Sequence, residues 1–298
     1  MMKILGYIGF TIVSILVCLY LTFPADVMGQ RLSHELRKQT KGQINLSFES
    51  FDLAGPNGIE AEGVDIKMGQ RDPIHVDSLS THVQWLSLFT LSPALEAEVG
   101  LGAGTVQLEV APQGAGMDIG VDIDQLNLES PPILGKYAGL PIRGIISGGV
   151  DSGWTDSIRT LKGEGTITLQ KVSVGPGKVV GVTIPAISLG DIELGLTADK
   201  GVVEIKSYKQ SGGDFQTKVS GGVELRSRTA ATVFKGLCFE FKGEPTFLNK
   251  NGKLKSAIEL ATIQLKKDAR DFLHLPLTGT IGRMRMKKSL CSAGASKK

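Results

Sequence analysis

Composition narrows the class of this chain before any motif is considered. The sequence has 298 residues, with 33 Lys and Arg against 30 Asp and Glu, so its formal net charge is only +3. A charge this close to balance argues against a nucleic-acid binder held by a basic field, and against a disordered acidic or basic tail protein. Glycine is the outlier, at 38 residues where a usual share of about 7% would give roughly 21. Because glycine in a helix interior costs about 1 kcal/mol relative to alanine, the excess favours β structure with many turns.

The first apolar segment determines the expected compartment. Residues 4–23 contain no charged side chain, and a helix of that length, at about 1.5 Å per residue, is long enough to cross a bilayer core. A cleaved signal peptide is the alternative, but cleavage after Ala25 would put Phe23 where a small residue is needed. We therefore expect residues 1–23 to be a retained transmembrane signal anchor.

The orientation of this anchor is read from two opposing features. Lys3 precedes the span, whereas Arg31, Arg37, Lys38 and Lys41 follow it, so a simple positive-inside count favours a cytoplasmic C-terminal part. A long following domain can nevertheless be translocated despite moderate charge. The β-rich domain expected here is of a kind associated with the bacterial periplasm. We expect a single-pass protein of the inner membrane with its C-terminal domain in the periplasm.

Residues 24–42 are predicted to form a juxtamembrane amphipathic helix. Met28, Leu32 and Leu36 recur every four residues, and Gly42 is a suitable stop. The basic residues of this segment are expected to form a solvated face that also tolerates anionic headgroups. A specific partner-binding helix is the alternative.

After Gly42 the apolar residues alternate with a period of two instead of 3.6. Strands are predicted at residues 44–48, 106–110, 117–128, 166–170, 192–198, 203–205, 214–225, 237–241 and 273–281. Within 117–128 the alternation changes phase at Leu126, which indicates a bulge. The segment Ala198-Asp199-Lys200-Gly201 predicts a hairpin turn.

This alternation determines the predicted fold class. Each strand has one buried and one wet face, as in antiparallel sheets, and glycine clusters separate the runs. Helical spacing of apolar residues occurs at 253–267. An outer-membrane barrel is disfavoured, since four Tyr and two Trp are too few for aromatic girdles. We predict a mainly β fold: a long curved antiparallel sheet or sandwich over residues 43–288 with one or two short helices, followed by a flexible polar tail at 289–298.

Histidine and acidic residues suggest no catalytic or metal site. His34 begins no H-E-x-x-H motif, and His274 has no motif partner. His75 and His82 flank a strand-like stretch and could approach each other, but no third ligand lies nearby. Asp118, Asp122 and Asp124 share one strand face without calcium-loop spacing, so they are expected to be a solvated polar face, with a weak cation or basic-partner contact as the alternative.

Nucleophile and phosphate motifs are also missing or incomplete. No G-x-S-x-G elbow occurs, because Ser147 comes one place late in residues 144–148. Residues 175–179 partly resemble a phosphate loop, but Val179 replaces the hydroxyl residue that would hold magnesium. Residues 163–165 lead into a strand, so they cannot present helix amides to a pyrophosphate. We therefore assign no catalytic, cofactor-binding or metal-binding residue, and we expect a protein that is not an enzyme and needs no cofactor.

Three cysteines leave one question of pairing open. Cys18 lies in the expected anchor and is expected to be unpaired. Cys238 and Cys291 could form a disulfide in an oxidising periplasm, which would pin the polar tail, or they could remain apart.

Four segments resemble one known family. Residues 21–26 (LTFPAD) leading into the short basic helix, 211–215 (SGGDF), 219–226 (VSGGVELR) and 275–281 (LPLTGTI) resemble the type II secretion system protein N family (GspN). The resemblance spans essentially the whole chain, and its motifs are structural glycines and apolar alternation. It implies a non-enzymatic accessory subunit anchored in the inner membrane with a periplasmic β domain. The chain is also similar to the broader AsmA-like group, whose curved sheets are associated with lipid transfer and outer-membrane assembly.

Two function classes follow as expectations. The first is a scaffold of type II protein secretion that binds other subunits through edge strands or surface contacts. The second is a lipid-handling module whose apolar sheet face shelters the acyl chains of phospholipids in a groove. A periplasmic hydrolase is disfavoured because no nucleophile–base pair can be assembled, and no nucleic-acid partner is expected.

Overall fold

The computed structural model describes most of the chain after the first segment. It describes Tyr7, Phe10, Thr11, Ser14, Cys18 and Thr22, and residues 24–68, 73–83, 94–129, 140–179, 182–261 and 265–291. Among these residues, no helix has both the length and the apolar character that crossing a bilayer requires. Most of the anchor predicted at 1–23 lies outside the described residues, as does the tail from 292 onward. The anchor therefore stays a prediction.

The fold is mainly β and antiparallel, as the alternation predicts. The chain divides into two compact units, Met1–Gly100 and Leu101–Lys298, which we call unit 1 and unit 2. The domain predicted at 43–288 includes parts of both units.

Unit 1 is a small sheet covered by one helix. Its elements are α2 (Ala25–Gln39), β1 (Ile44–Ser47), β2 (Ser50–Leu53), the 3-10 turn η1 (Gly55–Asn57), β3 (Gly58–Met68), β4 (Ile74–Val83) and β5 (Leu95–Leu101). β1 and β2 pair with opposite halves of β3. β4 pairs with β3 on one side and with β5 on the other. Phe51, Ala61, Val64 and Val76 are buried and form its core.

α2 packs on the sheet through a small residue. Met28 and Leu32 are exposed, at 43% and 44%, whereas Gly29 is buried. A Cβ at Gly29 would lie 3.0 Å from the ring of Phe51, so the missing side chain lets the helix approach the sheet closely. Of the predicted apolar stripe, Met28 and Leu32 therefore lie away from the sheet, and Leu36 is half-buried. The helix itself is confirmed, and Gly42, at φ +75°, follows its end.

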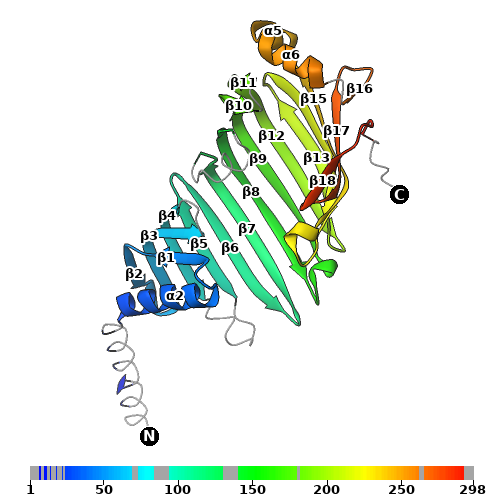
Figure 1. The fold of residues 1–298 in the computed structure, drawn as a ribbon. Helices are drawn as coiled ribbons and strands as arrows, with labels where there is room; N and C mark the ends of the chain where they lie inside the picture. The colour runs from blue at the N-terminus through cyan, green and yellow to red at the C-terminus, as the bar shows by residue number, and fades with distance from the viewer. Residues whose placement is uncertain are drawn as a thin grey trace. The chain divides into compact units, whose positions relative to one another are not determined.

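Unit 2 is one large antiparallel sheet (Figure 1). Its main strands lie side by side in the order β6 (Gly104–Gln113), β7 (Gly116–Asn127), β8 (Ile142–Trp154), β9 (Lys162–Val174), β12 (Ile187–Asp199), β13 (Val202–Ser211), β14 (Phe215–Glu224), β15 (Val233–Gly243) and β17 (Leu273–Thr280). β16 (Lys266–Lys267) and β18 (Arg283–Met286) both pair with β17, and β10 (Gly177–Val179) and β11 (Val182–Ile184) form a separate hairpin. The helices are η2 (Ile158–Thr160), η3 (Thr229–Ala231), α5 (Pro245–Lys250) and α6 (Gly252–Ala261).

Two local predictions in unit 2 are confirmed. β12 and β13 are joined by the predicted turn, with Asp199 opposite Val202 and both Lys200 and Gly201 at positive φ. That conformation is the one that two-residue hairpins require. The register of β7 against β8 shifts between Ile123 and Leu126, where the phase change predicts a bulge.

The helix predicted at 253–267 is correct only at its beginning. α6 ends at Ala261, and Lys266 and Lys267 form β16, where they pair with His274 and Leu273. At residues 266–267 the chain therefore pairs with β17 as a strand, although the spacing of the apolar residues predicts a helix. α5 was not predicted; it is a short helix that starts with Pro245.

The choice between a curved sheet and a sandwich is decided for the described part of unit 2. Each main strand pairs with its neighbours in one path, and the β10–β11 hairpin is the only other sheet formed by the described residues. Of the two predicted alternatives, the described residues of unit 2 form the single sheet, and no second large sheet faces it among them.

Candidate functional site

One face of the unit 2 sheet is formed by apolar side chains, and we call it the apolar face. The strand registers place them in cross-strand rows. One row is Leu108, Val121, Val150, Leu196 and Ile205, and the next is Val106, Ile123, Ile167, Leu194 and Tyr208. Towards β17 the face continues through Val219, Phe239 and Leu275.

The side chains of the apolar face remain partly exposed. All of those in the two rows are only half-buried, and Phe239 is 37% exposed. In a two-layer protein such positions form the core and lose nearly all contact with water. Soluble monomers rarely expose contiguous apolar patches of more than a few hundred Å². The apolar face is therefore a candidate binding surface.

The described helices of unit 2 lie at the ends of its strands and leave this face open. α6 contacts β11, α5 contacts α6, and η2 contacts β8. Figure 1 shows α5 and α6 at one end of the sheet, beyond β10 and β11. The strands between those ends have a face that no described helix of this unit covers.

A cleft of about 830 Å³ lies where β13 and β14 separate. The two strands pair only from Val202 to Glu204, and Gln210 bridges them further along. Its amide donates hydrogen bonds to the carbonyl oxygens of Leu189 and Phe215, at 2.6 and 2.8 Å. Its side-chain oxygen accepts one from the backbone N–H of Thr217 at 2.6 Å. These bonds compensate for the missing ladder.

Residues from both faces of the sheet line this cleft. Tyr208 belongs to the apolar face, and its hydroxyl is hydrogen-bonded to Thr217. Burial raises the pKa of Tyr208, against the opposing effect of that hydrogen bond. Lys206 and Lys218 also line the cleft. The Lys218 ammonium lies 4.4 Å from the centroid of the Phe272 ring.

The opposite face of the sheet is polar. Asp118 and Asp122 lie on it opposite Gly153 and Gly149, and Asp124 lies opposite Thr105. The structure therefore places the acidic row on one strand face, as predicted. Farther along the sheet, Lys209 pairs with Glu193 at 2.9 Å.

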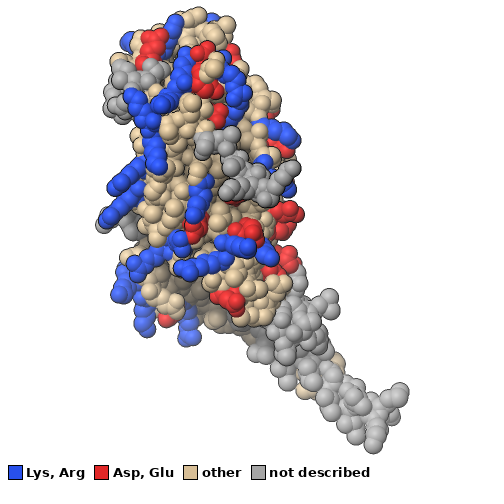
Figure 2. Space-filling model, turned by 90° about the vertical axis from the view of Figure 1, so that its right-hand side faces the viewer, with Lys and Arg blue, Asp and Glu red and all other residues tan. Residues whose placement is uncertain are grey.

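Charged side chains are also dense at the edge of unit 2 that includes β18. All four residues of β18 are exposed, Arg283 and Arg285 among them. The side of the molecule shown in Figure 2 carries many Lys and Arg side chains among fewer acidic ones.

Three of the four histidines stand apart from one another. His34 is on α2, whereas His75 and His82 lie near opposite ends of β4. The suggestion that His75 and His82 approach each other is wrong, because a strand of this length extends them along one line at about 3.3 Å per residue. His75 instead lies 2.9 Å from Asp65 and 3.8 Å from Asp77.

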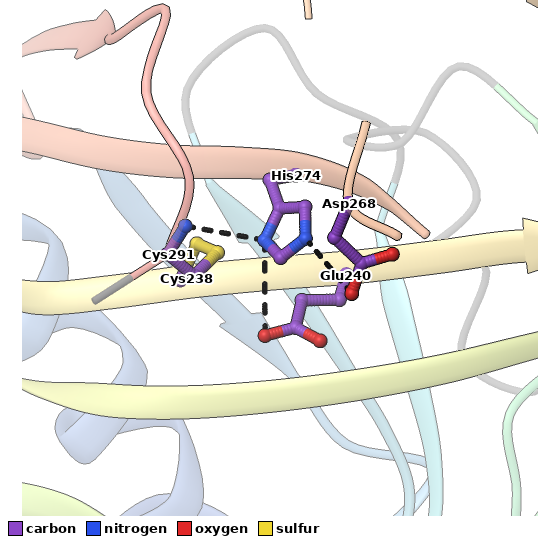
Figure 3. The surroundings of a disulfide bond; sticks show 5 residues. All are labelled: Cys238, Glu240, Asp268, His274 and Cys291. Carbon is purple, nitrogen blue, oxygen red and sulfur yellow. Dashed lines mark hydrogen bonds and ion pairs between the residues drawn. A yellow bond between two sulfur atoms is a disulfide. The ribbon is translucent and has the colours of Figure 1, made fainter. Parts of the chain in front are cut away.

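The fourth histidine belongs to a cluster that the sequence did not predict (Figure 3). Cys238 and Cys291 form a disulfide, which settles the pairing that the sequence left open. The backbone N–H of Cys291 donates to Nδ1 of His274 at 3.1 Å. Carboxylate oxygens of Glu240 and Asp268 lie 3.8 and 3.6 Å from Nδ1 and Nε2 of that ring.

The acidic members of this cluster are held by the sheet and by a turn. Glu240 faces His274 because β15 and β17 pair them directly. Asp268 accepts hydrogen bonds from the backbone N–H groups of Phe272 and Arg270, at 2.8 and 2.9 Å. Burial works to raise the pKa of Asp268, but these bonds and the charges of His274 and Arg270 together leave the pKa below its ordinary value. Apart from the possible disulfide, no pattern in the sequence indicates this cluster, because its members are up to 53 residues apart and follow no motif.

The glycine motifs lie on strands. Gly163 and Gly165 are on β9, and Gly177 begins β10. None of these glycines lies at the start of a helix, so they present no helix amides.

Comparisons of the chain with protein-family models, with curated proteins and with solved structures found no match. The resemblance to GspN and to AsmA-like proteins therefore remains an expectation from the sequence.

Proposed function

We propose that the protein is a lipid-handling module of the bacterial inner membrane, with unit 2 in the periplasm sheltering the acyl chains of phospholipids. The observation that carries the proposal is the apolar face, a broad aliphatic surface left half-exposed. Covering such a surface is favourable by roughly 25 cal/mol per Å² of apolar area removed from water.

An acyl chain suits this face better than a protein segment does. The strands in the middle of the sheet already use their backbone groups in ladders with two neighbours. A peptide laid over the face would leave its own backbone without partners, at a cost of about 1–3 kcal/mol for each buried group. An acyl chain has no polar group to satisfy. Lys206 and Lys218, at the cleft between β13 and β14, would suit the phosphate of a headgroup.

Native mass spectrometry of the full chain in mild detergent tests the proposal. We expect phospholipid to co-purify with the wild type. Ile167→Glu puts a charge on the apolar face and should reduce the bound lipid several-fold, because an ionised carboxylate is poorly tolerated beside acyl chains. Thr168→Glu is the matched control, since it places the same charge on the neighbouring residue of β9, on the polar face.

Two results would contradict the proposal. Circular dichroism first establishes that both variants retain the β spectrum. Wild-type protein free of lipid, or lipid retained equally by Ile167→Glu and Thr168→Glu, would exclude acyl-chain binding on this face.

A second candidate function rests on a different observation. β18 is a short, fully exposed strand paired on one side with β17. Such an edge can receive a strand from another protein. We propose, as the alternative, an accessory scaffold of type II secretion that binds other subunits at this edge, as the GspN resemblance implies.

A further inference from the structure

We propose that the Cys238–Cys291 pair is a redox-controlled metal site: when the disulfide is reduced, the two thiolates and His274 bind a zinc-like divalent cation. Potential ligand atoms of Cys238, His274 and Cys291 all lie within 4.8 Å of one another. Zn²⁺ binds Cys sulfur at about 2.3 Å and His nitrogen at about 2.0–2.1 Å, so only small movements would bring these three atoms around one ion.

A buried nitrogen without a hydrogen bond is the second observation. His274 is 5% exposed, and among the described residues its Nε2 has no hydrogen-bond partner. Buried polar atoms are normally satisfied, and an exception calls for an explanation such as an ion. An ion on Nδ1 would provide one, because it would replace the Cys291 N–H at that nitrogen and leave the N–H of Nε2 to the Asp268 carboxylate on the other side of the ring.

The surroundings of the ring indicate which nitrogen would bind the ion. Nδ1 lies on the cysteine side, where it accepts a hydrogen bond from Cys291, and Glu240 lies 3.8 Å from it (Figure 3). Nε2 lies on the other side, 3.6 Å from the Asp268 carboxylate. Metal-binding histidines usually donate their second N–H to such a group, which fixes the ring and makes it a better ligand. The remaining carboxylate or a water would complete four ligands.

The oxidised disulfide is converted to the metal-bound state by reduction and then by exchange of protons for the ion. An external dithiol gives two electrons and two protons to the Cys238–Cys291 disulfide, is itself oxidised to a disulfide, and leaves two thiols. Zn²⁺ then displaces both thiol protons and forms two metal–thiolate bonds. Cys291 is only half-buried, so a reductant can approach from its side, whereas Cys238 is 2% exposed. In both states the segment around Cys291 stays tied to β15.

Cobalt titration of the full chain in detergent tests the proposal. Cys18→Ser is used as the background, because Cys18 is the free cysteine. Co²⁺ added to the reduced protein should produce a thiolate-to-cobalt charge-transfer band and the intense visible bands of a tetrahedral site, at one ion per chain. The oxidised protein should show neither. Zn²⁺ should displace the cobalt and raise the melting temperature of the reduced protein only.

The variants separate the ligands from their surroundings. His274→Gln should weaken metal binding by more than tenfold, and Asp268→Asn by about tenfold, as expected for a residue that orients a ligand. His75→Gln is the matched control. His75 also lies between two carboxylates, but it does not belong to the group formed by Cys238, His274 and Cys291.

Two outcomes would overturn the proposal. The first is reduced protein that binds no cobalt while retaining its β spectrum, which would leave a structural disulfide only. The second is cobalt binding of unchanged affinity in His274→Gln, which would place the metal elsewhere. If His274→Gln fails to fold, Cys291→Ser serves instead, since it removes one thiolate at the end of the described chain.

Discussion

His75 links the stability of unit 1 to pH. Its hydrogen bond to the Asp65 carboxylate raises its pKa, with burial acting in the opposite direction and the charges of Asp65 and Asp77 adding to the rise. A histidine whose pKa is raised by folding stabilises the folded state below its unfolded pKa, near 6.5, and loses that contribution as the pH rises through the folded pKa.

The expected result is a pH-dependent difference between the wild type and His75→Gln. Above about pH 5, where the carboxylates remain ionised, the wild type should have the higher melting temperature. The difference should shrink as the pH rises past the folded pKa of His75. Melting curves at several pH values, at low salt, measure it. A difference that is constant with pH would show that the Asp65 contact does not depend on the charge of the ring.

Single residues also show where sequence reasoning stops. The turn at Lys200-Gly201 and the bulge before Leu126 follow from local patterns, so they could be predicted. The contacts of His274 could not, because they depend on β15, β17 and the Asp268 turn meeting in space. The pattern of residues around His274 in the sequence does not indicate which distant residues will surround it.

At the scale of elements, the β12–β13 hairpin depends on Gly201. This residue has φ +74°, and a Cβ added to it would lie 2.8 Å from the carbonyl oxygen of Ile158. Gly114, in the β6–β7 turn, has φ +63° but nothing within 4 Å of an added Cβ. The two positions therefore share the backbone conformation and differ in the space around it.

We predict that Gly201→Ala destabilises the protein more than Gly114→Ala does. The left-handed conformation alone costs a residue with a Cβ about 1–2 kcal/mol. Gly201→Ala must in addition displace the Ile158 carbonyl. Urea unfolding of both variants, followed by circular dichroism, compares the two losses. Equal destabilisation would mean that the turn relaxes away from Ile158 at no cost.

α2 shows why element faces are harder to predict than elements. Its existence follows from helical spacing, but its packing face is determined by Gly29 and Ser33, not by its largest apolar residues. Ser33 donates a hydrogen bond to the carbonyl oxygen of Leu46 at 2.5 Å, and Gly29 lets Phe51 approach. Met28 and Leu32 are left exposed beside Arg31, an arrangement that suits the headgroup region of a membrane.

At the scale of the whole molecule, the two proposed functions use different surfaces of unit 2. Acyl-chain binding needs the apolar face and makes no use of β18, whereas strand addition needs the β18 edge and makes no use of the apolar face. One variant on each surface can therefore distinguish them in cells. Ile167→Glu alters the face. Met284→Pro removes a backbone donor from the open edge, because Lys287 and Arg285 face β17 and Met284 therefore faces away from it.

We predict that a deletion strain carrying Ile167→Glu has a weakened outer membrane, seen as increased sensitivity to detergent, while export of secreted enzymes stays normal. Met284→Pro should restore both properties to the wild-type level, because it leaves the apolar face intact. The secretion scaffold predicts the reverse: Met284→Pro lowers the export of secreted enzymes, and Ile167→Glu does not. Normal export and a normal outer membrane in the deletion strain itself would contradict both proposals, since each surface would then be dispensable.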